Sequence, residues 1–145
     1  MAKTNTAAYP QTIKYDYAVA TAATGSLNDD TPTNMVTLLT AGGEGNRVTK
    51  IWAVPRATSS AGVLYLWVST DSGSTKRLAL TKSIAANTVS ATSAPVCVEF
   101  CWNNDVARPI SESEPFELEN GAILYAGYSQ ALSDGMVFHT ISIEY

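Results

Sequence analysis

The sequence has 145 residues, of which 46% are hydrophobic and only 15% are charged, and its formal net charge is −4. A chain of this length fits a single domain, and its hydrophobic content excludes an intrinsically disordered protein. Its nine Lys and Arg residues are scattered. This excludes nucleic acid as a partner, because binding of the phosphate backbone needs clustered positive charge.

The low charge also predicts a neutral, hydroxyl-rich surface, since ordinary soluble domains carry roughly 25% charged residues. Such a surface is typical of proteins that pack against copies of themselves, and it is compatible with secretion as well. No apolar run approaches the roughly 20 residues of a membrane-spanning helix, so we expect no membrane partner. The first residues lack the apolar segment of a signal peptide, which favours synthesis in the cytoplasm without export.

Residues 1–12 are polar and rich in alanine, and they lack the apolar content to fold alone. We expect an extended N-terminal arm over this segment and a single folded domain over residues 13–145. The arm is expected to order against a neighbouring subunit. Its candidate interface residues are Lys3, Thr4, Asn5, Thr6, Tyr9 and Pro10.

The first half of the domain predicts short β-strands separated by turn residues. We expect strands at 13–21, 34–41 and 47–56, with a loop at 25–33 that is rich in Asp, Thr and Pro. Alternation along 47–56 divides the side chains between two faces. One face is expected to hold Val48, Lys50, Trp52 and Val54, and the other Thr49, Ile51 and Ala53.

Residues 63–70 are apolar at nearly every position, which predicts a central strand covered on both faces. The sequence Asp71-Ser72-Gly73-Ser74 then predicts a tight turn into a strand at 76–85, so the two strands should form a hairpin.

In the second half we expect strands at 96–102, 112–119, 122–128 and 136–145. Asn120-Gly121 is the strongest hairpin signal of the chain and predicts that 112–119 pairs with 122–128. Eight or nine strands without a helix predict an all-β fold, a two-sheet antiparallel β-sandwich or a jelly roll.

The two cysteines, Cys97 and Cys101, lie four residues apart in the predicted strand 96–102. In a strand they share a face but lie about 13 Å apart, whereas a disulfide needs Cα atoms within about 7 Å. We therefore predict no bond between them and expect any disulfide to join different chains. The face that carries Val98, Phe100 and Trp102 is the more apolar, so Cys97, Glu99 and Cys101 are candidates for an outer or intersubunit face. The inverted strand, with both thiols buried, remains the alternative.

The sequence offers no constellation for catalysis. His139 is the only histidine, which excludes a histidine metal cluster, and no serine-hydrolase motif accompanies it. Glu117 and Glu119 are better interpreted as a solvated strand face than as paired catalytic acids. We expect no enzyme, no cofactor and no metal. Trp52, Trp67 and Trp102 are interpreted as core residues, with a sugar-binding shelf formed by them and the seven tyrosines as the alternative.

Three segments resemble a recurring pattern in small capsid decoration (cement) or head-fibre-like proteins of tailed bacteriophages. They are Val36-Thr37-Leu38-Leu39-Thr40-Ala41-Gly42-Gly43-Glu44-Gly45-Asn46-Arg47-Val48-Thr49-Lys50-Ile51, Ser59-Ser60-Ala61-Gly62-Val63-Leu64-Tyr65-Leu66 and Phe116-Glu117-Leu118-Glu119-Asn120-Gly121-Ala122-Ile123-Leu124-Tyr125-Ala126. The chain departs from this pattern in having Asn120-Gly121 in place of Pro-x-Gly, and in its long arm.

The resemblance implies a β-sandwich on the outer surface of a virion capsid, often a trimer, that reinforces the shell against internal DNA pressure. The partners implied are further copies of the chain and the major capsid protein. Two other functions stay open, namely a carbohydrate- or receptor-binding module of a phage fibre and a structural protein of the tail or neck.

Overall fold

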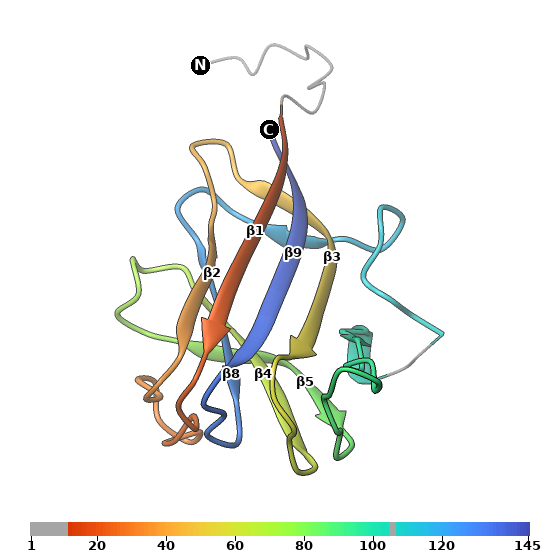
Figure 1. Ribbon diagram of the computed structural model, residues 1–145. Coiled ribbons are helices and arrows are strands. Elements are labelled where there is room, and N and C mark those ends of the chain that lie inside the picture. Colours follow the sequence, from red (N-terminus) through yellow and green to blue (C-terminus); the bar gives the residue numbers. More distant parts are fainter. Residues whose placement is uncertain (1–11, 105–106) are drawn as a thin grey trace, which may run out of the picture.

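The computed structural model describes residues 12–104 and 107–145, which form two antiparallel β-sheets packed face to face (Figure 1). The first sheet contains, in spatial order, β1 (Thr12–Ala20), β9 (Met136–Glu144), β3 (Asn46–Pro55) and β6 (Val98–Glu99), with β7 (Phe116–Leu118) also paired to β3. The second sheet contains β2 (Val36–Thr40), β8 (Ile123–Tyr128), β4 (Gly62–Ser69) and β5 (Arg77–Ile84). The predicted all-β, two-sheet antiparallel sandwich is confirmed.

The chain passes repeatedly between the two sheets. β1, β3 and β9 belong to the first sheet, while β2, β4 and β8 belong to the second. Most strands that follow one another in sequence therefore lie in opposite sheets, and most neighbours within a sheet come from distant parts of the chain, with the β4–β5 hairpin as an exception. This wrapped strand order is that of a jelly roll. A 3₁₀ turn, η1 (Trp102–Asn104), follows β6.

The core lies between the sheets and is built from alternate positions of the long strands. Ile51 of β3, Leu64 and Leu66 of β4 and Phe138 of β9 are fully buried there. The predicted central strand is confirmed, because β4 lies between β8 and β5 and is buried on both faces. The predicted hairpin around residues 71–74 is also confirmed, since β4 pairs with β5.

One face assignment in β3 is wrong. Val48 pairs with Ser142 but Lys50 pairs with Ile141, so Thr49 is an extra residue in the ladder. Such a bulge shifts the alternation by one position. Val48 is therefore fully buried on the same face as Ile51, and not on the face of Lys50.

The hairpin predicted at Asn120-Gly121 is also wrong, although the turn is present. Gly121 has a positive φ of 72°, and the Ala122 N–H donates to the Glu119 carbonyl at 3.0 Å. However, β7 pairs with β3 in the first sheet, whereas β8 pairs with β2 and β4 in the second. A tight turn reverses the chain locally, but long-range pairing decides which sheet each strand joins.

The boundary of the predicted arm shifts by one residue, because Thr12 begins β1. The arm candidates Lys3, Thr4, Asn5, Thr6, Tyr9 and Pro10 lie outside the described residues. Within the described part of the chain, no helix has the length and apolar content needed to cross a membrane.

Two glycines with positive φ offer a matched test of the fold. At Gly45 (φ 93°) an added Cβ would lie 2.5 Å from the Leu118 carbonyl oxygen, whereas at Gly121 (φ 72°) it would meet no atom within 4 Å. We expect Gly121→Ala to lower the free energy of unfolding by about 1–2 kcal/mol, the cost of a left-handed residue. Gly45→Ala should cost roughly 1–3 kcal/mol more, because the backbone must also move. Urea unfolding of both variants measures the difference, and equal losses would contradict the close approach of the Gly45 turn to β7.

Candidate functional site

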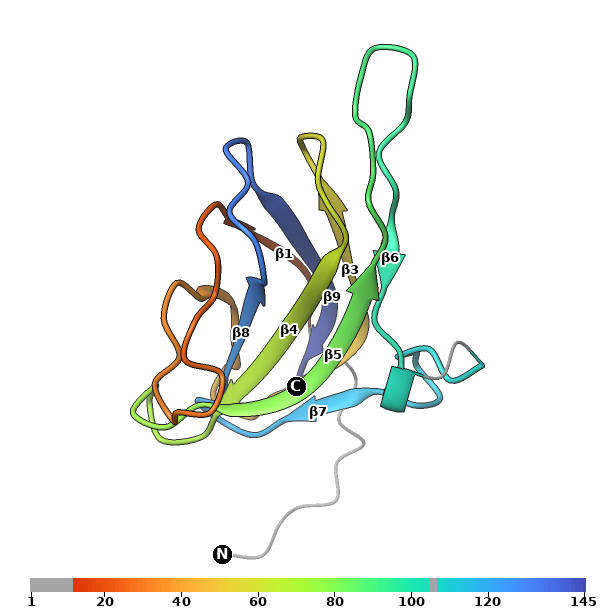
Figure 2. The same cartoon turned by 90° about the horizontal axis from the view of Figure 1, so that it is seen from below.

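The outer face of the second sheet is covered by the chain itself. Tyr65 and Trp67 alternate with core residues of β4 and so point away from the core, yet they are only 9% and 1% exposed. Residues 21–35, between β1 and β2, lie against this side beside β8 (Figure 2). The Thr24 N–H donates to the Tyr128 carbonyl at 2.8 Å, and the Lys76 N–H donates to the Asp30 carbonyl at 2.8 Å.

The outer face of the first sheet is open. In Figure 1, β1, β9 and β3 lie in front, and none of the described chain crosses over them. The side chains of β1 on this face are strongly exposed, with Ile13 at 76%, Tyr15 at 56% and Tyr17 at 66%. A solvated sheet face normally carries polar side chains. This face, which we call the open face, therefore differs from an ordinary solvent-facing sheet.

The register of the three strands places the open-face residues in rows. Tyr17 of β1 lies opposite His139 of β9, which lies opposite Trp52 of β3. The same pairing joins Ile13 to Ile143 and Tyr15 to Ile141. The open face consists of Ile13, Tyr15, Tyr17, Val19, Lys50, Trp52, Val54, Val137, His139, Ile141 and Ile143.

An aromatic cluster occupies the centre of the open face. The rings of Trp52 and His139 are stacked, with centroids 5.0 Å apart and planes at 14°. The Tyr15 hydroxyl forms a hydrogen bond of 2.6 Å with His139 Nδ1, and its ring lies 6.0 Å from that of Trp52. Burial lowers the pKa of His139 below its usual value. The cluster is thus held in place before any partner binds.

Charges lie at the border of the open face and are paired. Arg47 forms an ion pair with Glu117 at 2.8 Å, and Lys50 lies 4.0 Å from Glu99. The hydrogen bond with Glu117 raises the pKa of Arg47 above its usual value. The structure therefore places the predicted interface residue Glu99 beside Trp52, at the rim. The charges therefore border the open face on its β3 side, and an apolar surface bordered by polar groups is the usual composition of a protein–protein interface.

The prediction that both cysteines face outward is wrong for Cys101. Cys97 is exposed, but Cys101 is buried and its Sγ lies 3.7 Å from the Glu99 carbonyl oxygen. The predicted strand 96–102 is reduced to Val98–Glu99. Alternation stops there because the chain turns into η1, where Asn103 adopts a φ of 53°. Both cysteines are free thiols in the structure.

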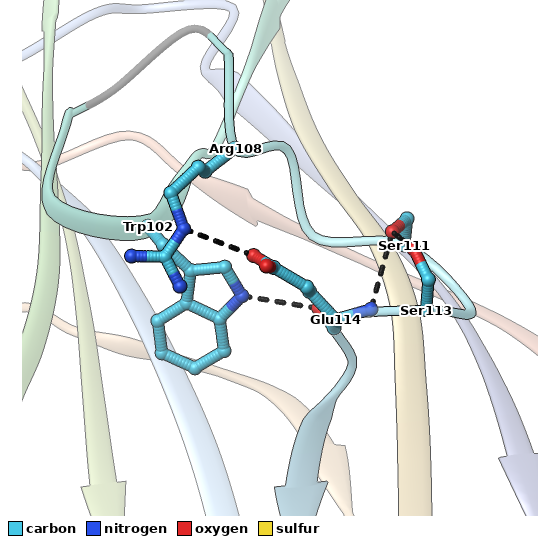
Figure 3. Close-up of polar contacts among 5 residues, drawn as sticks. All are labelled: Trp102, Arg108, Ser111, Ser113 and Glu114. Atoms are coloured by element: carbon cyan, nitrogen blue, oxygen red, sulfur yellow. Dashed lines mark hydrogen bonds and ion pairs between the residues drawn. The ribbon is translucent and has the colours of Figure 1, made fainter.

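The apolar side chains of the same segment do point inward as predicted. Phe100 is fully buried, and Val98 and Trp102 pack against the core. Trp102 stacks on Phe116 at 5.4 Å, and its indole N–H donates to the Glu114 carbonyl at 3.0 Å (Figure 3). Arg108 forms an ion pair with the Glu114 carboxylate at 3.1 Å. These contacts fix the loop before β7 and give Glu114 a structural role.

The three tryptophans do not form a common shelf. Trp67 is buried on the second sheet, Trp102 belongs to η1, and Trp52 lies on the open face. The ring of Trp52 is contacted by His139 and has the Lys50 ammonium 5.7 Å from its centroid. The more exposed aromatic side chains of the open face are Tyr15 and Tyr17, two of the tyrosines considered for the sugar-binding shelf but not predicted to lie at an interface. Their alternation along 13–21 was the available signal.

Among the described residues, no group of three or more His, Cys, Asp and Glu side chains is placed to hold a metal ion. Comparison of the chain with protein-family models, curated proteins and solved structures finds no match.

The two thiols should differ in reactivity. We expect Cys97 of the folded protein to react rapidly with a thiol reagent, and Cys101 to react only on unfolding, because Cys97 is exposed and Cys101 is buried. Thiol counting with and without denaturant measures this, and the Cys97→Ser variant should show no rapid phase. Equal rates for both thiols would contradict the inward position of Cys101. Any disulfide that forms on oxidation should join two chains.

His139 should titrate below pH 6.5, because burial disfavours its charged form. The unfolded chain then binds more protons than the folded chain, so stability should fall as the pH drops below 6.5 toward the lowered pKa. The single imidazole gives a single NMR titration curve, which measures the pKa directly. His139→Gln should flatten the pH dependence of unfolding in this range. A pKa at or above 6.5 would show that the ring is more hydrated than the structure indicates.

Proposed function

We propose that this chain is a non-catalytic structural protein of a tailed bacteriophage. In this role it decorates and stabilises the outer surface of the capsid through contacts with its own copies and with the major capsid protein. The observation that carries the proposal is the open face, a sheet surface of apolar and aromatic side chains with paired charges along its β3 border.

The open face leaves apolar surface in contact with water. Ile13, Tyr15 and Tyr17 leave most of their side-chain surface in water, and burial of apolar surface gains about 25 cal/mol per Å². Contiguous exposed apolar patches on soluble proteins usually mark an interaction site. A surface of this kind favours a function in binding another surface over a function in chemistry.

The fold is compatible with the proposal but does not select it. Jelly rolls serve in viral capsids and in lectins alike, and a fold alone does not determine function. The sequence resemblance favours the capsid role, and its three segments correspond to β2 and β3, to β4, and to β7 and β8. Structural elements of both sheets therefore carry the resemblance. The low content of charged residues also supports a protein that works within an assembly.

Binding to phage heads tests the proposal. Heads of the encoding phage that lack this protein are mixed with the purified chain and sedimented. We expect saturable binding to heads but not to isolated tails, and a higher temperature of DNA release from the decorated heads. Deletion of residues 1–11 should weaken head binding while leaving the thermal transition of the domain nearly unchanged.

Three other results would contradict this role. Binding to tails alone would assign the chain to the tail or neck. Binding to glycans, lost in Trp52→Ala and without binding to heads, would assign it to a carbohydrate-binding fibre module. Head binding that leaves the temperature of DNA release unchanged would remove the stabilising role.

A further inference from the structure

We propose that the open face is a self-association surface, which docks against the open face of a second copy of this chain. The inference rests on the proposed function for its setting, and it deepens that function by naming the partner of this surface.

The shape suits a second sheet. β1, β9 and β3 are joined in continuous antiparallel register, so their outward side chains form rows across the face. Two sheet faces pack about 10 Å apart when such rows interdigitate. Ile13, Tyr15 and Tyr17 project along one strand of this face, and the same row on a second copy offers a surface of matching chemistry.

The paired charges favour a second copy of this chain over a strongly charged partner. Of the described residues at the border of the open face, the cations Arg47 and Lys50 are matched within the chain by Glu117 and Glu99. Two open faces can therefore approach without placing like charges together. A strongly charged partner would instead require unpaired charges of the opposite sign on this face, because complementary charges set specificity at interfaces.

The exposed apolar side chains supply part of the area of a specific contact. Tyr15 and Tyr17 are 56% and 66% exposed, and a tyrosine carries roughly 150–250 Å² of surface, so together they offer roughly 250 Å². Ile13, at 76% exposure, adds to this on the same strand. The partly exposed side chains of β9 and β3 extend the surface toward the roughly 800 Å² per partner of a standard interface.

The edge of the same sheet is protected, which favours association through the face. β1 is the edge strand of the first sheet, and its inward positions include Lys14 and Asp16. Lys14 forms an ion pair with Glu144. Inward-pointing charges on an edge strand are a known means of preventing edge-to-edge pairing. Tyr17 and Ile13 point the other way, onto the open face.

Sedimentation of matched variants tests this inference. Tyr17→Asp and Ile13→Asp place a carboxylate on the open face, whereas Leu78→Asp places one at another exposed apolar position, on β5 of the second sheet, where Leu78 is 47% exposed. At about 50 µM we expect the wild-type chain and Leu78→Asp to sediment as assemblies of more than one copy. Both open-face variants should dissociate, with an increase of at least about tenfold in the dissociation constant. Unchanged circular dichroism and urea midpoints show that the variants are folded.

Several outcomes would overturn the inference. They are a wild-type chain that remains a single copy, open-face variants that stay assembled, and equal dissociation of Leu78→Asp. The wild-type chain could also be a single copy whose binding to heads is lost in Tyr17→Asp. That result would assign the open face to contact with the capsid protein. If only the proposed function fails, the chain will assemble through the open face but will not bind heads. This result differs from each of the outcomes above.

Discussion

The inward direction of Phe138 and Met136 on β9 is the constraint on which the open face depends. Both side chains are fully buried, and in a strand their direction fixes that of every neighbour. His139 and Ile141 must therefore point outward. Because β9 lies between β1 and β3, its register also sets which side chains of those two strands face the solvent.

This arrangement places Asn46, Thr140 and Ser142 in the core, where they are hydrogen-bonded. Thr140 and Ser142 are fully buried, and the Thr140 hydroxyl donates to the Lys50 carbonyl at 3.1 Å. The Asn46 amide donates to Ser142 Oγ at 3.1 Å and accepts from the Gly42 N–H at 2.9 Å. Buried polar groups are tolerated when they are hydrogen-bonded. The hydroxyls of Thr140 and Ser142 can therefore face the core while Ile141 and Ile143 face outward. The apolar outer surface of the first sheet follows from this inversion.

Much of the fold could be predicted from the sequence, because strand signals are local. The alternation along 13–21 and the apolar run at 63–70 correspond closely to β1 and β4. The Asp71-Ser72-Gly73-Ser74 turn correctly joined β4 to β5, since neighbouring strands of a hairpin need no distant information. The sequence also showed which residues alternate along 136–145. It did not show which of the two alternating sets faces the core, because both contain apolar side chains.

Long-range strand pairing decided the features of the fold that the local sequence did not predict. Asn120-Gly121 encodes a turn, but only the pairing of β7 with β3 and of β8 with β2 and β4 makes that turn a passage between sheets. Cys101 is buried because the strand ends at Glu99, and Val48 changes face because the β3–β9 ladder contains a bulge. Neither event has a local signal. By itself the sequence determined strands, turns and an all-β class, since these depend on neighbouring residues. Only the tertiary structure decided that Ile13, Tyr15 and Tyr17 lie on a surface that no described segment covers, since exposure depends on which distant segments pack above each sheet.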